Sequence, residues 1–122
     1  LLAGALSRAD VVPVITEIYS LQLPPVVEVL AREEMQRAID AGSDCIGINN
    51  RNLKTFVTTL DTTYDLKEMA PANCTLISES GIKTPEDVAQ LKAAGAHAIL
   101  VGESLLREPS PGEAARRLMG LI

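Results

Sequence analysis

Short, largely apolar runs of four residues alternate along this chain with longer segments in which apolar residues recur at helical spacing. The runs span 26–29, 45–48, 74–77 and 98–101, and the helical segments span 10–21, 31–41, 61–69, 84–94 and 111–121. Near-continuous apolar strands are typical of parallel sheets, because helices cover their faces. The alternation therefore predicts an α/β fold in which helices cover a parallel sheet.

One unit of this alternation recurs within the chain. Residues 41–46 and 94–99 each contain a helix end, a glycine and the start of an apolar run, and they lie 53 positions apart. Gly42 and Gly95 stand where glycine commonly ends a helix. Two strand–helix units fill the interval. Because no linker or low-complexity segment divides the 122 residues, we expect a single domain.

The composition narrows the classes of partner and compartment. Because 16 acidic residues outnumber 11 basic ones, the net charge is −5 and no broad nucleic-acid-binding surface is expected, although small anions still fit. No apolar run reaches the ~18 residues of a membrane span, so no membrane partner is expected. Cys45 and Cys74 lie in apolar runs without a nearby His, which favours free thiols over a metal site or a disulfide. We therefore expect no metal ion and a reducing, cytoplasmic compartment.

Polar residues and glycines accompany the end of every predicted strand. The candidates are Glu28 in the first run, Asn49 and Arg51 after the second, Glu79, Ser80 and Gly81 after the third, and Gly102, Glu103 and Ser104 after the fourth. The carboxyl ends of parallel strands meet at one edge of a sheet, where α/β proteins build their sites. We therefore expect these residues to form one active-site rim.

Three of the candidates allow two interpretations each. Glu28 lies among valines, so it is either a solvent-facing residue of an edge strand or a buried acid or base that requires a partner. Its placement favours the second interpretation. Asn49 and Asn50 suit a turn as well as a site, since Asn tolerates left-handed backbone geometry. Arg51 is either a surface-loop residue or a bidentate contact for an anion.

The glycines at the last two strand ends indicate a phosphate site, since glycine lets backbone amides approach an anion. Gly81 is also consistent with an ordinary loop. In (β/α)8 barrels, phosphate commonly binds after strands 7 and 8 beside a short extra helix, and residues 104–106 have the length of that helix. The acidic pairs 33–34 and 86–87 stand in first helical turns and are expected to cap helices. His97 is expected to be structural.

Four segments, taken in order, resemble the indole-3-glycerol phosphate synthase family. They are Val-Glu-Val (27–29), Gly-Ile-Asn-Asn-Arg-Asn-Leu (47–53), Ser-Glu-Ser-Gly-Ile (78–82) and Val-Gly-Glu-Ser-Leu (101–105), with Leu-Asp-Thr-Thr (60–63) in support. The resemblance implies a (β/α)8 TIM barrel of tryptophan biosynthesis, a carboxy-lyase that uses neither a metal nor an organic cofactor. Its reaction converts 1-(2-carboxyphenylamino)-1-deoxyribulose 5-phosphate to indole-3-glycerol phosphate, carbon dioxide and water.

The resemblance also implies a role for each rim residue. Glu28 is the expected general base of the dehydration, Asn49 orients the substrate, and Arg51 contacts an anion. Glu79 and Ser80 line the pocket, with Glu79 beside a catalytic lysine. The phosphate cradle consists of Gly81, Gly102 and the backbone near Glu103 and Ser104.

The matching part runs only from the end of the family's strand 4 to its helix 8. The family's catalytic lysines lie on earlier strands, and no segment here matches them. A closed barrel typically needs ~250 residues, whereas this chain offers four strands and a strand remnant at Leu1–Ala3. We therefore expect residues 1–122 to be the C-terminal half of a TIM-barrel domain, a partial barrel of about four to five βα units that is inactive alone.

Two functions follow from this partial match. The first is a portion of the enzyme that binds a phosphorylated substrate once a missing N-terminal half-barrel is supplied. The second is a non-catalytic phosphate-binding or assembly module, a half-barrel that self-associates or pairs with an N-terminal half. Another phosphate-binding barrel of the same pathway is a weaker match, because it lacks Asn-Asn-Arg-Asn. The helix over 10–21 is atypical of the family, since Pro13 is tolerable only in its first turn and Pro24–Pro25 must end it.

Overall fold

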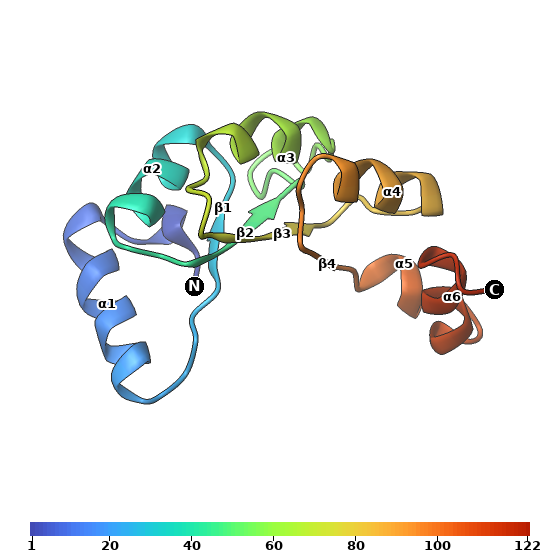
Figure 1. Cartoon of the computed structure of the whole chain (residues 1–122), viewed down its shortest axis with the longest axis horizontal. Helices are drawn as coiled ribbons and strands as arrows, with labels where there is room; N and C mark the ends of the chain where they lie inside the picture. The colour runs from blue at the N-terminus through green and yellow to red at the C-terminus, as the bar shows by residue number, and fades with distance from the viewer.

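A computed structural model describes all 122 residues, and it contains one parallel sheet with the strand order β1-β2-β3-β4. The strands are β1 (Val27–Val29), β2 (Cys45–Asn49), β3 (Thr75–Glu79) and β4 (Ala98–Leu100). Each strand pairs in parallel with the next along the chain. The prediction of an α/β fold with a parallel sheet is confirmed, and each strand lies within two residues of its predicted position (Figure 1).

The helices follow the predicted alternation with small shifts at their ends. They are α1 (Arg8–Ser20), α2 (Arg32–Asp40), α3 (Asp61–Leu66), α4 (Pro85–Ala93), α5 (Glu103–Leu106) and α6 (Pro111–Leu118), with 3-10 turns η1 (Ala3–Ala5) and η2 (Lys67–Met69). The segment predicted as one helix over 61–69 is divided between α3 and η2. The short helix expected near 104–106 is α5.

The first helix differs from its prediction at its N-terminus. The Ser7 carbonyl accepts hydrogen bonds from the N–H groups of Asp10 and Val11, so α1 begins at Arg8 instead of Asp10. Pro13 consequently lies beyond the first turn, which corrects the expectation that only a first-turn position would tolerate it. The helix remains continuous through Pro13 and forgoes the backbone hydrogen bond that a proline does not donate.

The predicted helix-end signals are present. Gly42 and Gly95 have φ angles of 78° and 100° and follow α2 and α4 directly after their last turns. Thr84 and Asp87 form a reciprocal cap at the start of α4, with Asp87 Oδ2 accepting from the Thr84 N–H at 2.9 Å. Glu34 accepts from the Leu30 N–H at 2.7 Å. His97 is structural as expected, because its Nδ1 accepts from the Leu76 N–H at 3.0 Å.

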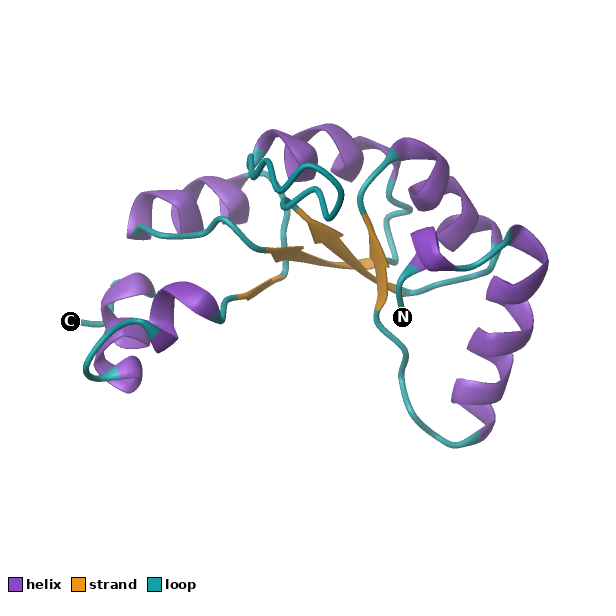
Figure 2. Cartoon of the chain, turned by 180° about the vertical axis from the view of Figure 1, so that it is seen from behind, coloured by secondary structure: helices purple, strands orange, loops and turns teal.

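The helices α2, α3 and α4 lie on one face of the sheet, here called the outer face (Figures 1 and 2). Side chains alternate between the faces of a strand, and the apolar residues at alternate positions of β1, β2 and β3 are buried on this side. The main core contains Val27, Val29, Ile46, Ile48 and Leu76 with Met35, Ala38 and Leu66 from the helices. A smaller core joins Ile82, Leu91 and Leu118. The hydrophobic core therefore lies between the sheet and these helices.

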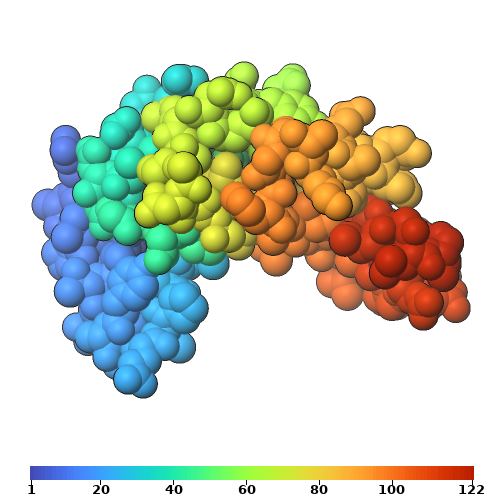
Figure 3. Space-filling model, in the orientation of Figure 1, coloured from blue at the N-terminus to red at the C-terminus, as the bar shows by residue number.

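The opposite, inner face of the sheet is open. It carries Glu28, Gly47, Asn49, Ile77, Glu79, Ala98 and Leu100, as the strand register requires. Leu100 is 60% exposed, and the molecule forms an arch that is hollow on this side (Figure 3). At the β1 edge, the predicted strand remnant is reduced to one parallel bridge between Leu2 and Glu28. On its other side β4 has no neighbouring strand.

None of the helices combines the length and the apolar character needed to cross a membrane.

Candidate functional site

Three polar side chains of the inner face meet where β1, β2 and β3 end. Asn49 and Glu79 are direct neighbours in the β2–β3 register. Asn49 Nδ2 donates to Glu28 Oε1 at 2.8 Å, and Asn49 Oδ1 accepts from the Arg51 N–H at 2.9 Å. Glu28 is therefore half-buried and paired, which does not fit the interpretation of a solvent-facing strand residue.

Glu79 is the most perturbed group of this cluster. Its side chain is buried, and burial, followed by the negative charge of neighbouring Glu28, raises its pKa from 4.5 to about 7. A carboxyl group with a pKa near neutrality exchanges protons readily at physiological pH, as general acids and bases do. The cluster therefore places beside Glu28 a second carboxyl group that holds its proton more tightly than an ordinary glutamate.

Gly47 explains how the Glu79 carboxyl group fits against the sheet. A Cβ atom added at Gly47 would collide with Glu79 Oε1, so the carboxyl group lies directly over this glycine. Gly47 stands within the second apolar run and was not among the predicted site residues. A glycine inside a strand is nevertheless a known signal of close approach by another group, and this signal points to Gly47.

We expect the ionisation of Glu79 to make stability depend on pH. The pKa of Glu79 is about 7 in the folded chain and 4.5 ordinarily. The unfolded chain therefore loses this proton at lower pH than the folded chain does, and the free energy of unfolding falls as the pH rises from 4.5 to about 7. Urea unfolding of the wild type and Glu79→Gln at pH 5 and pH 8 tests this. The variant should gain stability relative to the wild type as pH rises, whereas the exposed-surface variant Glu86→Gln should not. A pH-independent difference between wild type and Glu79→Gln contradicts the prediction.

Asn50 anchors the rim from beneath. It is 1% exposed, and its Nδ2 donates to Ser78 Oγ and to the Ser80 carbonyl, both at 3.0 Å. Its Oδ1 accepts from Thr63 Oγ1 at 2.8 Å and from the Thr63 N–H at 3.2 Å. Asn50 therefore ties the start of α3 to the ends of β2 and β3. The turn interpretation does not describe Asn50, because its side chain is buried and fully used.

A cavity of about 600 Å³ opens beside the ends of β3 and β4. It is lined by seven predicted residues, Arg51, Glu79, Ser80, Gly81, Gly102, Glu103 and Ser104, and also by Thr58, Lys83 and Arg107 among others. Glu28 and Asn49 do not line this cavity and reach it only through the cluster with Glu79. Sequence reasoning missed Lys83 and Arg107, since both stand in helix or loop positions where a surface cation is ordinary.

The backbone at the third strand end is unusual. Ser80 has a φ of 68° and Gly81 a φ of 77°, so two successive residues are left-handed. A Cβ at Gly81 would lie 2.6 Å from Thr58 Cγ2, so the position excludes a side chain for a second reason. Left-handed non-glycine residues are uncommon and concentrate at functional sites. The N–H groups of Gly81 and of Gly102 form no backbone hydrogen bond and are available to a ligand.

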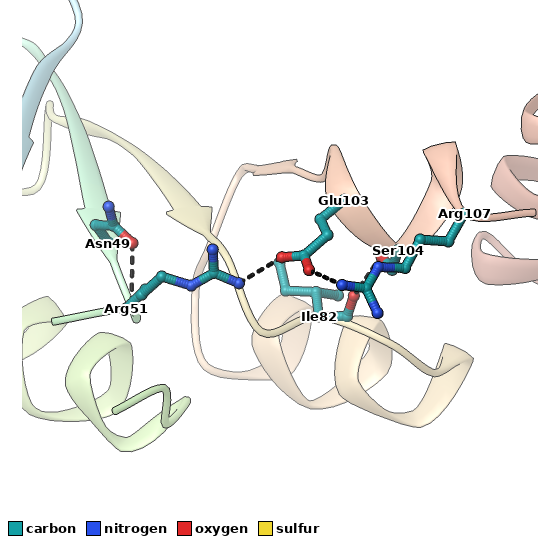
Figure 4. Close-up of polar contacts among 6 residues, drawn as sticks. All are labelled: Asn49, Arg51, Ile82, Glu103, Ser104 and Arg107. Atoms are coloured by element: carbon teal, nitrogen blue, oxygen red, sulfur yellow. Dashed lines mark hydrogen bonds and ion pairs between the residues drawn. The ribbon is translucent and has the colours of Figure 1, made fainter. Parts of the chain in front are cut away.

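Side-chain contacts hold the two glycine-bearing loops together (Figure 4). Ser104 Oγ donates to the Ile82 carbonyl at 3.3 Å, which joins α5 to the loop after β3. Arg51 Nη2 and Arg107 Nη2 donate to the two oxygens of Glu103 at 2.7 and 2.6 Å. The Glu103 side chain is thus engaged by cations, and only its backbone is free for an anion.

Residues 1–118 match the sequence profile of the indole-3-glycerol phosphate synthase family. The chain belongs to this family. The multifunctional tryptophan biosynthesis protein of Schizosaccharomyces pombe is 44% identical over 121 residues, which are 99% of this chain and 16% of that protein. The indole-3-glycerol phosphate synthase of Acinetobacter baumannii is 41% identical over 121 residues, 98% of this chain and 45% of that protein.

The structural comparison agrees with a TIM-barrel origin. A solved structure of mandelate oxidase superposes with a TM-score of 0.71 at 27% identity, covering 95% of this chain and 36% of that chain. The α/β arch of this indole-3-glycerol phosphate synthase family member is therefore a partial TIM barrel. The chain spans less than half the length of these curated relatives.

Proposed function

We propose that this chain forms the C-terminal half of an indole-3-glycerol phosphate synthase and acts catalytically only within a complete barrel. The observation that carries the proposal is the convergence of the Glu28–Asn49–Glu79 cluster and the glycine-bearing cavity at one rim. The first group suits proton transfer, and the second suits a phosphate. The reaction would be the decarboxylating ring closure and dehydration that yields indole-3-glycerol phosphate, carried out in the cytoplasm.

The carboxyl cluster supports assigning the proton-transfer steps to this half. We assign Glu28 as the base of the dehydration, with Asn49 orienting both this carboxylate and the substrate. Glu79 and Ser80 line the reacting end of the cavity. The pKa of Glu79 is raised because burial and the neighbouring Glu28 outweigh the lowering effect of the Leu1 ammonium group, so no cation of this chain compensates the charged form fully. A lysine from another segment would supply positive charge beside the Glu79 carboxylate.

The loops that carry Gly81 and Gly102, here called the glycine corner, support a phosphate subsite at the other end of the cavity. Gly81 and Gly102 offer free backbone N–H groups. We assign the same role to the N–H of Glu103, the first residue of α5. Lys83 and Arg107 add positive charge to the lining. Backbone amides with nearby cations stabilise phosphate without needing a metal ligand set.

The open inner face supports the need for a partner. Leu100, Leu2 and Val26 are 60, 42 and 37% exposed, and the β4 edge has unpaired backbone groups. An N-terminal half-barrel would supply the remaining strands and cover this surface. Self-association into a phosphate-binding module is the second candidate, favoured by the same exposed surface. It is weaker on electrostatic grounds, because a closed pair would bring two copies of Glu28 and Glu79 together without a lysine.

Complementation tests the proposal directly. The N-terminal portion of the Acinetobacter baumannii relative, ending where the match to this chain begins, is co-expressed with the chain, and indole-3-glycerol phosphate formation is measured. We expect no product from either part alone and product from the mixture. Product from this chain alone would refute the dependence on a partner. A stable one-to-one complex without activity would refute the catalytic assignment, and a homodimer that excludes the N-terminal part would favour the self-association candidate.

A further inference from the structure

Arg51 and Arg107, the two arginines to which anion-binding roles are assigned above, are both already paired with a carboxylate of this chain. One oxygen of Glu103 accepts from Arg51 Nη2 at 2.7 Å, and the other accepts from Arg107 Nη2 at 2.6 Å (Figure 4). Arg51 follows β2, whereas Arg107 directly follows α5. Two guanidinium groups from separate elements therefore converge on a single carboxylate, and all three residues line the cavity.

The position between the two arginines has the chemistry of an oxyanion site. Guanidinium groups bind carboxylate and phosphate oxygens through charge-assisted hydrogen bonds. The hydrogen bond from Arg51, followed by the charge of Arg107, lowers the pKa of Glu103, so its side chain is an anion at neutral pH. The chain thus fills this position with its own carboxylate.

The family resemblance implies an anion contact for Arg51, and Arg107 lines the same cavity. We propose that Glu103 is a resident anion on these two arginines, and that an incoming phosphate or carboxylate group displaces it. The identification of that group with part of the phosphorylated substrate rests on the proposed function. The competition itself concerns any small oxyanion.

Solvent exposure makes such an exchange feasible. The side chains of Arg51, Glu103 and Arg107 are 40, 50 and 76% exposed. Water screens exposed ion pairs and keeps them weak, and a displaced Glu103 carboxylate would enter solvent instead of a buried environment. An anion that replaces it would also gain the free N–H groups of Gly81 and Gly102 on the same cavity wall.

The test is a titration of the full chain with inorganic phosphate, followed by calorimetry and by the NMR signals of the arginine Nε–H groups. Glu103→Gln preserves the size of the side chain and removes its charge. We expect phosphate to bind this variant about three- to tenfold more tightly than the wild type, with the signals of Arg51 and Arg107 moving on binding. Glu103→Ala should act in the same direction and serves as a second variant.

Three further variants locate the effect. Glu108→Gln makes the same change of charge on an exposed residue that pairs with Arg117 at 3.6 Å, so it controls for overall charge and should change affinity little. Adding Arg107→Gln to Glu103→Gln should remove the gain. Gly102→Ala probes the glycine corner separately, because its φ of −121° suits alanine and the added Cβ meets no atom of the chain within 4 Å.

The outcomes separate this inference from the proposed function. Equal or weaker phosphate binding by Glu103→Gln and Glu103→Ala overturns the resident-anion inference, and so does an equal gain in Glu108→Gln. If Gly102→Ala still weakens phosphate binding in that case, the phosphate subsite of the proposed function is supported. If Glu103→Gln raises phosphate affinity and adding Gly102→Ala to it leaves that affinity unchanged, the result supports the arginine site and counts against the glycine corner. Absence of phosphate binding in every variant overturns the inference, and complementation then decides the proposed function independently.

Discussion

Replacing Glu28 by Gln lowers the turnover of the complemented barrel by about two to four orders of magnitude, the usual loss when a general base is removed. The physical reason is that the amide keeps the shape of the side chain and an oxygen that accepts from Asn49 Nδ2, now 2.8 Å from Glu28 Oε1, but takes no proton at neutral pH. The measurement is steady-state formation of indole-3-glycerol phosphate by the chain together with the N-terminal part.

Glu33→Gln is the matched control for this variant. Glu33 is exposed in the first turn of α2, shortly after β1, and carries the same functional group without a hydrogen bond to the Glu28–Asn49–Glu79 cluster. Its turnover should equal that of the wild type. Wild-type turnover in Glu28→Gln, with complex formation intact, would show that another group is the base. A rise in KM alone would assign Glu28 to binding.

Replacing Asn50 by Ala destabilises the chain by about 2–4 kcal/mol, because it removes a buried side chain together with its hydrogen bonds to Thr63, Ser78 and Ser80. Thr63 loses the acceptor at 2.8 Å for its hydroxyl group, and the Ser80 carbonyl loses the donor at 3.0 Å. Chemical denaturation followed by circular dichroism measures the free energy of unfolding.

Asn52→Ala provides the comparison for Asn50→Ala. Asn52 is exposed, and its Oδ1 accepts only from the nearby N–H groups of Lys54 and Thr55 at 2.9 and 3.1 Å. Removal of such a local surface contact should cost less than ~1 kcal/mol. Equal losses in the two variants would show that burial of the Asn50 network contributes no more than a surface turn.

The family and the fold were accessible from the sequence because their signals are local. Apolar runs, the cap at Thr84 and the glycines after α2 and α4 each depend on a few successive residues, and all of them stand where expected. Helix ends were less accurate: α1 begins at Arg8 instead of residue 10, and α6 ends at Leu118 instead of residue 121, since a helix end depends on which backbone groups form the terminal hydrogen bonds. For the same reason of locality, the strand ends identified most of the rim residues that line one cavity.

The relations between distant side chains were decided only by the tertiary structure. The sequence alone placed Asn50 and Glu103 at strand ends, but it did not distinguish a turn from a buried anchor at Asn50, nor did it indicate that the Glu103 side chain pairs with two arginines. Those distinctions depend on distances between residues that lie 28 positions apart in the Asn50–Ser78 contact and 52 apart in the Arg51–Glu103 contact. Sheet register and loop packing set such distances, whereas the sequence itself determined the order of strands, the chemistry of their ends and the family to which the chain belongs.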